Sequence, residues 1–113
     1  MTGLRVLVVD DEPQIQRFLR HALEAAGYHG EFAATGSEAL RLCAADMPDL
    51  VILDLGLPDM AGFELLKKIK KQAKFRDLPV VIYTSKDLSK QEESQLKKYA
   101  ATIITKSADS AER

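Results

Sequence analysis

The sequence predicts an α/β fold in which helices cover a parallel β-sheet. Strand-like and helix-like segments alternate along the chain, which favours this class over all-α and all-β folds. The strand-like segments are residues 4–10, 29–34, 49–54, 80–84 and 101–105, and the helix-like segments are residues 13–26, 37–46, 60–74 and 89–99. Residues 6–9 and 50–53 are unbroken apolar runs, which is typical of strands buried on both faces. Right-handed crossovers between such strands place helices on both sides of the sheet.

The first two helices carry clear signals at their ends. The first opens at Pro13 and ends at Gly27, with an apolar stripe at helical spacing between them. We expect this stripe to face the sheet, and it consists of Ile15, Phe18, Leu19, Ala22, Leu23 and Ala26. The second helix begins near Ser37 and ends before Pro48. Its predicted inward face consists of Leu40, Cys43 and Ala44.

The third and fourth helices are expected to differ in how firmly they pack. The third turns a lysine-rich face outward, and its predicted inward residues are Leu65, Leu66, Ile69 and Ala73. The fourth is mostly polar, with Leu96 and Tyr99 as its evident anchors, so we predict that it is the least firmly docked helix.

The residues after the fifth strand predict a final helix that is truncated or absent. Residues 106–113 look like a loop and the first turn of a helix, which Ser110 would cap. We favour the interpretation that the sequence is a piece of a longer protein. The alternative is a domain without this helix, whose uncovered apolar surface would cause it to self-associate.

Composition narrows the functional classes. The length gives room for one domain, which we expect to span residues 1–113. The 16 basic and 17 acidic side chains leave a net charge of −1, which gives no electrostatic case for binding nucleic acid or a membrane. Cys43 is the only cysteine, which excludes an internal disulfide and argues against a cysteine-based zinc site. No apolar stretch is long enough for a signal peptide or a membrane span, so we expect a cytoplasmic protein.

Three aspartates stand where strands are predicted to end. Asp10 and Asp11 follow one apolar run, and Asp54 follows the other. The carboxyl ends of parallel strands meet in one crevice, where three carboxylates repel one another unless a cation joins them. Helix capping explains Asp10 and Asp11 poorly, because they lie too far before Pro13. Since Mg²⁺ prefers oxygen ligands, the sequence predicts a magnesium site in which Asp54 is also a nucleophile and the Gly56 carbonyl faces the crevice.

Two further polar groups follow later strands. Thr84 ends the fourth strand and Lys106 follows the fifth. A hydroxyl and an ammonium group beside the acids are what a phosphoryl group on Asp54 requires, since its oxygens need hydrogen-bond donors and positive charge. Lys106 is equally well explained as a solvated lysine that only offsets the acids.

Four short segments at these strand ends resemble the motifs of a known family. They are Val-Val-Asp-Asp-Glu-Pro at 8–13, Leu-Asp-Leu-Gly-Leu-Pro-Asp-Met-Ala-Gly at 53–62, Tyr-Thr-Ser at 83–85 and Ile-Thr-Lys at 104–106. In order and spacing they resemble the response-regulator receiver domain of two-component phosphorelay signalling. The resemblance covers essentially the whole chain. It implies a flavodoxin-like, doubly wound, five-stranded parallel sheet with the strand order 2-1-3-4-5.

The resemblance also implies a function for each candidate residue. Asp54 would accept a phosphoryl group, and Asp10 and Asp11 would hold Mg²⁺ together with the Gly56 carbonyl. Thr84 and Lys106 would bind the phosphoryl oxygens. The donor would be a phosphohistidine on a histidine kinase or phosphotransfer domain. The chain would then be a phosphoacceptor rather than an enzyme, with at most slow self-phosphorylation from small donors and slow self-dephosphorylation.

Two positions depart from the family pattern. Ile103 stands where receivers usually have an aromatic residue that reports phosphorylation, and Ser107 stands where they usually have proline. We expect the phosphorylation chemistry to survive both changes, and we expect repacking of Ile103 to change the surface less than an aromatic switch would. The tail resembles receivers of hybrid histidine kinases more than those followed by DNA-binding domains. The expected downstream partner is another protein, bound at the face formed by the fourth helix and fifth strand.

Two alternative functions compete with the signalling switch. A phosphohydrolase with an aspartyl-phosphate intermediate would resemble this site, but such enzymes typically have a second acid where Gly56 stands. A receiver-like interaction module that is not regulated by phosphorylation is supported by the missing aromatic residue and the missing proline. Turnover of a phosphate ester would indicate the first alternative, and partner binding that ignores a phosphoryl mimic would indicate the second.

Overall fold

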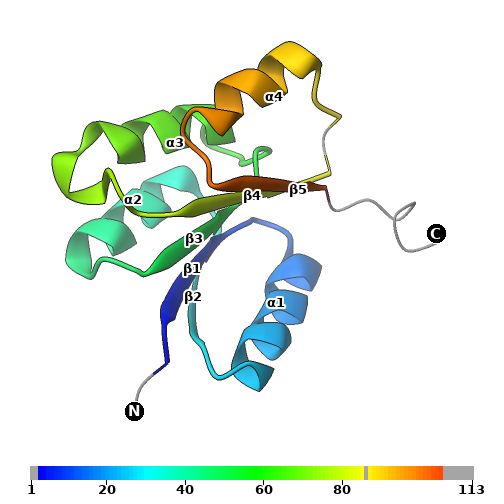
Figure 1. Cartoon of the computed structure of the whole chain (residues 1–113). Helices are drawn as coiled ribbons and strands as arrows, with labels where there is room; N and C mark the ends of the chain where they lie inside the picture. The colour runs from blue at the N-terminus through cyan, green and yellow to red at the C-terminus, as the bar shows by residue number, and fades with distance from the viewer. Residues whose placement is uncertain (1–2, 86, 106–113) are drawn as a thin grey trace.

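The five strands form one parallel sheet, as the sequence predicts. In this computed structural model, which describes residues 3–85 and 87–105, the strands are β1 (Arg5–Val9), β2 (His29–Ala33), β3 (Leu50–Leu53), β4 (Val80–Thr84) and β5 (Thr102–Thr105). They are ordered β2-β1-β3-β4-β5 (Figure 1). The predicted doubly wound α/β class and its strand order are therefore confirmed. The predicted start of a final helix lies at residues 106–113, outside the described residues.

Helices lie on both faces of the sheet. They are α1 (Pro13–Ala25), α2 (Gly36–Ala45), α3 (Gly62–Lys71) and α4 (Lys90–Lys97), with a short 3₁₀ turn, η1 (Ala73–Phe75), after α3. Figure 1 shows α1 on one side of the sheet and α2, α3 and α4 on the other. Alternate residues of a strand point to opposite faces, so Val6 and Val8 pack with Leu23 of α1, whereas Leu7 and Val9 join the larger core beneath the other three helices.

The side of the sheet that carries α1 is only partly covered. Within Pro13–Ala25 the one buried residue is Leu23, and Phe18 is 60% exposed. The prediction that the whole apolar stripe faces the sheet is therefore wrong for Phe18, Ala22 and Ala26, which are exposed. The physical reason is that α1 is the sole helix on this face in the described part of the chain, so nothing packs against its flank.

The opposite side of the sheet is densely packed. Leu65, Leu66 and Ile69 of α3 are fully buried, as predicted. Ala73 is exposed, because the backbone becomes extended at Gln72 and α3 ends before it. In α2, Cys43 is buried as predicted and Leu40 is half-buried, but the prediction is wrong for Ala44, which is exposed, because the buried side of the helix runs through Ala39 and Cys43.

The helix α4 is held by few contacts. Ser89 and Glu92 form a reciprocal capping box at its start, with both hydrogen bonds 3.0 Å long. Within Lys90–Lys97 only Leu96 is buried, whereas Tyr99 is exposed and its ring lies 6.2 Å from that of Phe63. This agrees with the expectation of a weakly docked helix.

In the parts of the chain that are described, no helix combines the length and apolar character needed to cross a bilayer.

Candidate functional site

Three buried polar side chains lie at the carboxyl edge of the sheet. In residues 3–85 and 87–105, the buried polar or charged residues are Asp10, Asp54 and Thr84, which are 2%, 7% and 2% exposed. The pairing of Val9 with Leu53 places the residues that follow them, Asp10 and Asp54, at neighbouring strand ends. The Asp54 amide donates a 2.9 Å hydrogen bond to the Val9 carbonyl, which fixes this neighbourhood.

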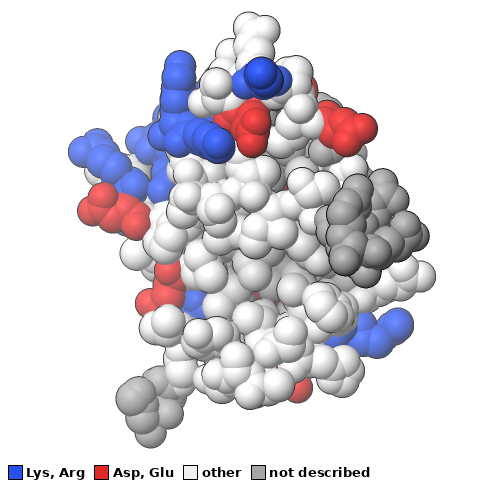
Figure 2. Space-filling view, turned by 45° about the vertical axis from the view of Figure 1, so that its right-hand side comes forward, with Lys and Arg blue, Asp and Glu red and all other residues white. Residues whose placement is uncertain are grey.

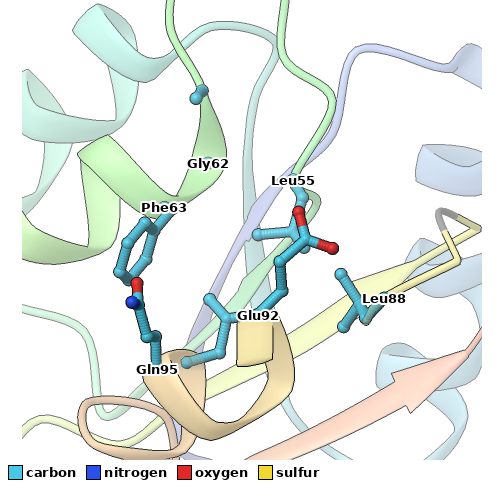
Figure 3. A pocket seen from close by; sticks show the side chains of 8 residues that line it. Leu55, Gly62, Phe63, Leu88, Glu92 and Gln95 are labelled. Carbon is cyan, nitrogen blue, oxygen red and sulfur yellow. The ribbon is translucent and has the colours of Figure 1, made fainter. Parts of the chain in front are cut away.

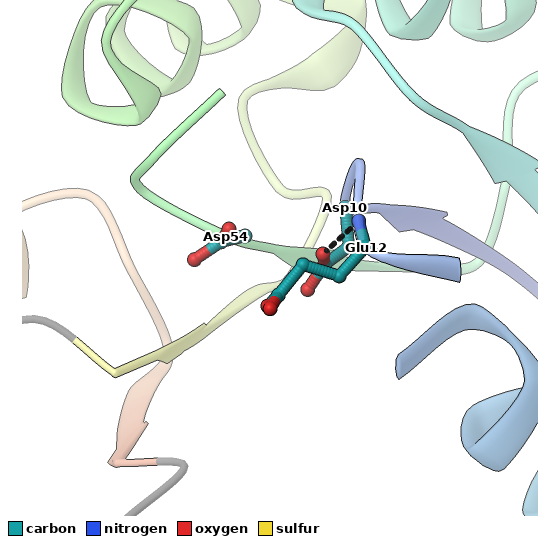
Figure 4. Close-up of side chains that lie close together, drawn as sticks. All are labelled: Asp10, Glu12 and Asp54. Atoms are coloured by element: carbon teal, nitrogen blue, oxygen red, sulfur yellow. Dashed lines mark hydrogen bonds between the residues drawn. The ribbon is translucent and has the colours of Figure 1, made fainter. Parts of the chain in front are cut away.

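Three carboxylates gather at this edge. Side-chain oxygens of Asp10, Glu12 and Asp54 all lie within 4.8 Å of one another (Figure 4). The backbone holds Asp10 in place, because the Glu12 amide donates to its Oδ1 at 2.9 Å. The side-chain amide of Gln16 also donates to the Asp10 carbonyl, at 2.6 Å. The first turn of α1 thus orients the acidic loop that precedes it.

The remaining predicted residues surround the same opening. A hollow of about 480 Å³ is lined by Asp11, Glu12, Asp54, Gly56, Thr84 and Ser85. The structure therefore brings together all the described residues that the sequence analysis selected, from the ends of three strands. Lys106 lies outside the described residues. The residue before it, Thr105, pairs with Thr84 across β4 and β5.

Glu12 is a candidate ligand that the sequence analysis missed. It occupies the N-cap position of α1, but its side chain makes no capping hydrogen bond. Its carboxylate lies beside Asp10 and Asp54 instead. Among the described residues Asp11 is outside this group of three and lines the hollow, so its part in metal binding stays a prediction. The unbroken Asp-Asp-Glu run was the signal that could have identified Glu12.

The donor set fits a hard divalent cation. Every candidate ligand is a carboxylate or carbonyl oxygen, which is the chemistry that Mg²⁺ prefers. Two of the carboxylates, those of Asp10 and Asp54, are buried side by side, and such burial costs free energy that a cation offsets. The cluster is also open toward the hollow, so water and a phosphoryl group can reach it.

The loop after Asp54 is folded tightly against α3. The Gly62 amide donates to the Leu55 carbonyl at 2.9 Å, and Gly56 pairs with Ala61 as an isolated bridge. A Cβ at Gly62 would stand 2.5 Å from the Leu55 Cα and 2.7 Å from the Asp54 carbonyl oxygen. Only glycine allows this approach, so Gly62 sets the backbone position of the Asp54 segment.

Asp59 ties the same loop to α2. Its carboxylate accepts hydrogen bonds from the Gly36 and Ser37 amides at 2.8 and 3.0 Å, and from the Ser37 hydroxyl at 3.0 Å. The amides of Gly36 and Ser37 hold the pKa of the Asp59 carboxyl below its usual value. Asp59, which is 23 residues after Gly36 in the sequence, therefore caps the start of α2. The hydroxyl of Thr35 also caps this helix by accepting a hydrogen bond from the Glu38 amide.

Comparisons with known proteins agree with this geometry. The sequence profile described as response regulator receiver domain matches residues 6–112. The transcriptional regulatory protein KdpE of Mycobacterium tuberculosis is 43% identical over 101 residues, which are 89% of this chain and 43% of that protein. The chain thus spans less than half the length of this curated relative.

Solved structures show the same fold. The N-terminal domain of a response regulator receiver protein from Methanoculleus marisnigri superimposes with a TM-score of 0.86 at 36% identity, covering 96% of this chain and 89% of that one. The signal receiver domain of a signal transduction histidine kinase from Syntrophus aciditrophicus superimposes with a TM-score of 0.82 at 32% identity, covering 92% of this chain and 79% of that one. This chain is therefore similar both to a receiver domain of a response regulator and to a receiver domain of a histidine kinase.

Proposed function

The chain belongs to the response-regulator receiver domain family, and from this premise we propose that residues 1–113 form a phosphorylation-dependent switch in a cytoplasmic two-component phosphorelay. The observation that supports the proposal most is the position of Asp54. It is nearly buried, ends β3 beside Asp10, and still lines a hollow that opens to solvent. A nucleophile at such a place is fixed in orientation and accessible from one side.

We propose that Asp10, Asp11 and Asp54 hold Mg²⁺ together with the Gly56 carbonyl. Glu12 is a further ligand candidate, because its carboxylate is within 4.8 Å of those of Asp10 and Asp54. When bound, the ion supplies positive charge beside the phosphoryl oxygens. Without it, the carboxylates of the site would repel these negatively charged oxygens. The hydroxyl of Thr84 and the ammonium group of Lys106 are the proposed donors to the remaining phosphoryl oxygens.

The proposed transfer is an in-line displacement at phosphorus. A carboxylate oxygen of Asp54 forms the new bond, the bond between phosphorus and the donor imidazole breaks, and the imidazole leaves with the electron pair. The chain contributes position and electrostatics, because Asp54 is held at the strand end by its backbone hydrogen bond to Val9. The donor in this proposal is a histidine kinase or phosphotransfer domain. Both histidines of this chain, His21 and His29, are exposed on elements away from the hollow.

The decisive test uses a small phosphodonor and the matched variant Asp54→Asn. We expect the wild-type protein with Mg²⁺ and acetyl phosphate to gain the mass of one phosphoryl group in intact-protein mass spectrometry. We expect Asp54→Asn to gain none, because an amide is not a comparable nucleophile. Asp46→Asn, which removes an exposed carboxylate near the opposite edge of the sheet, serves as the control and should behave like wild type. A wild-type protein that stays unmodified and ignores beryllofluoride would contradict the proposal.

The second candidate function is a receiver-like interaction module without phosphorylation control. Ile103 favours it, since it is half-buried against the core at the position where the family has its aromatic reporter. Partner affinity that is equal with and without beryllofluoride would support this function. We propose that the downstream partner is a protein that binds the face of α4 and β5. Origin from a hybrid histidine kinase remains a prediction, since KdpE is named a transcriptional regulatory protein.

A further inference from the structure

A hollow of about 390 Å³ lies between α3 and α4, apart from the acidic cluster (Figure 3). Its walls are mainly apolar and come from Leu55, Phe63, Leu88 and Leu96, and Glu92 and Gln95 of α4 stand at its border. Leu96 is the one buried residue of α4, so the rest of this helix contributes little side-chain volume to the space beside α3. Only about 90 Å³ of this space can be reached by a water-sized sphere. That is well below the volume of small-ligand sites, so the hollow suits a single apolar side chain rather than a small molecule.

A second hollow, which shares Ala61 and Phe63 with the first, is rich in lysine. The other residues that line this second hollow are Glu64, Lys67, Lys68 and Lys71, and the Glu64 carboxylate lies 3.9 Å from the Lys68 ammonium. Between residues 62 and 76 the sequence has six basic side chains and one acidic side chain. Figure 2 shows lysine and arginine side chains gathered at the upper left, with acidic side chains beside them, at the height where Figure 1 places α3 and α4.

The charges on this surface favour an acidic partner. In the described residues, neither Lys67 nor Lys71 forms an ion pair, and the Lys67 ammonium lies 5.3 Å from the centre of the Phe63 ring. Of the two acids on the α4 side, Glu92 accepts the Ser89 amide and Glu93 lies 3.7 Å from Lys97. A lysine-rich helix face is ordinarily just solvated. Here it borders an aromatic ring and an unfilled apolar hollow, which solvation alone does not explain.

We propose that this surface, formed by the α3–α4 hollow and by Lys67, Lys68 and Lys71, binds an acidic protein segment that inserts one apolar side chain between the helices. The inserted side chain supplies most of the affinity through burial, and the lysines select for acidic neighbours. Binding does not require phosphorylation of Asp54. However, Leu55 lines this hollow and directly follows Asp54 in the sequence. A shift of the backbone at Asp54 would therefore also move a residue in the wall of the hollow.

The test uses ¹⁵N-labelled protein, residues 1–113, and a synthetic peptide of about twelve residues, a length that spans one groove, rich in Asp and Glu with one central Leu. We expect amide shifts concentrated at Phe63, Leu88 and Gln95. Replacing the central Leu by Ser should weaken binding at least about tenfold, since the buried side chain is lost. The double variant Lys67→Gln, Lys71→Gln should weaken it about three- to tenfold at low salt.

Arg17→Gln on α1 is the matched control and should bind the peptide like wild type, because it removes a positive charge from the other face. The unmodified protein is used throughout, so failure here is distinct from failure of phosphorylation at Asp54. Shifts that are absent from α3 and α4 would overturn the proposal. Equal binding of the Leu and Ser peptides would also overturn it, since that result indicates charge attraction alone.

Discussion

Asp59 links two parts of the chain that no local pattern connects. Its carboxylate receives the amides of Gly36 and Ser37, so the loop that follows the candidate phosphoacceptor is fastened to the start of α2. The charged form of Asp59 is favoured by these hydrogen bonds, and this lowers its pKa in the folded protein. A lowered pKa stabilises the fold above the pKa of the unfolded chain, about 3.9, and this stabilisation is lost as pH falls through the folded value.

We therefore predict that Asp59→Asn reduces the free energy of unfolding at pH 7 and that its difference from wild type shrinks as the pH falls below about 4. The reason is that wild-type Asp59 takes up a proton there and loses its advantage as an acceptor. Urea unfolding at a series of pH values measures the difference. Glu24→Gln, an exposed change on α1, is the control, and a difference for Asp59→Asn that is independent of pH would contradict the prediction.

At the scale of elements, α4 depends on its cap more than the other helices do. It has eight residues and one buried side chain, so little packing holds it against fraying. Two reciprocal hydrogen bonds between Ser89 and Glu92 satisfy two of its free amides. The face of α4 and β5, which we propose as the binding site of the downstream partner, thus includes the helix with the least packing. The local stability of this helix is the easiest to change.

We predict that Ser89→Ala destabilises α4 by about 1 kcal/mol, which raises the hydrogen-exchange rates of its amides about fivefold. The amides of α3 should keep their rates, because α3 is held by three fully buried side chains. Hydrogen exchange followed by NMR makes both measurements. Ser94→Ala, in the same helix but away from the cap, should leave exchange unchanged or slower, and equal acceleration by both variants would refute a capping role.

At the scale of the whole molecule, the two faces of the sheet are covered unequally. Three helices, α2, α3 and α4, cover one face, whereas on the α1 side Phe18 is 60% and Ile104 is 48% exposed. Ile104 points to the α1 side, because its neighbour Ile103 packs into the opposite core. Its pairing partner Tyr83 is half-buried on the same side. Ile104 and Tyr83 thus leave apolar surface on the outermost strand, β5, and on its neighbour β4, and exposed apolar groups on an edge strand favour association.

We predict that residues 1–113 alone self-associate at high concentration, with a mass by light scattering above the 12.5 kDa of one chain. Phe18→Gln combined with Ile104→Thr should shift the mass toward that value, because it removes two exposed apolar side chains from this side of the sheet. Met47→Gln, an equally exposed site between α2 and β3, should not. A wild-type protein that stays monomeric at high concentration would show that α1 shields the face sufficiently.

The sequence by itself determined which segments form strands and helices and which residues stand at the strand ends. These features follow from local geometry, since an unbroken apolar run makes a buried strand and the residue after it must lie at the sheet edge. That is why Asp10, Asp54 and Thr84 could be selected before their burial was known. The placement of Lys106 stays a prediction, because it lies outside the described residues.

Only the tertiary structure decided which side chains meet. Glu12 joins Asp10 and Asp54 because the backbone after β1 turns its carboxylate toward β3, and Asp59 reaches α2 because the loop folds back over Gly62. Phe18 has the same helical spacing as Leu23 yet is exposed, because burial depends on what packs beside a helix as well as on its own periodicity. Contacts between distant segments depend on how whole elements pack, and short-range sequence patterns do not encode that packing.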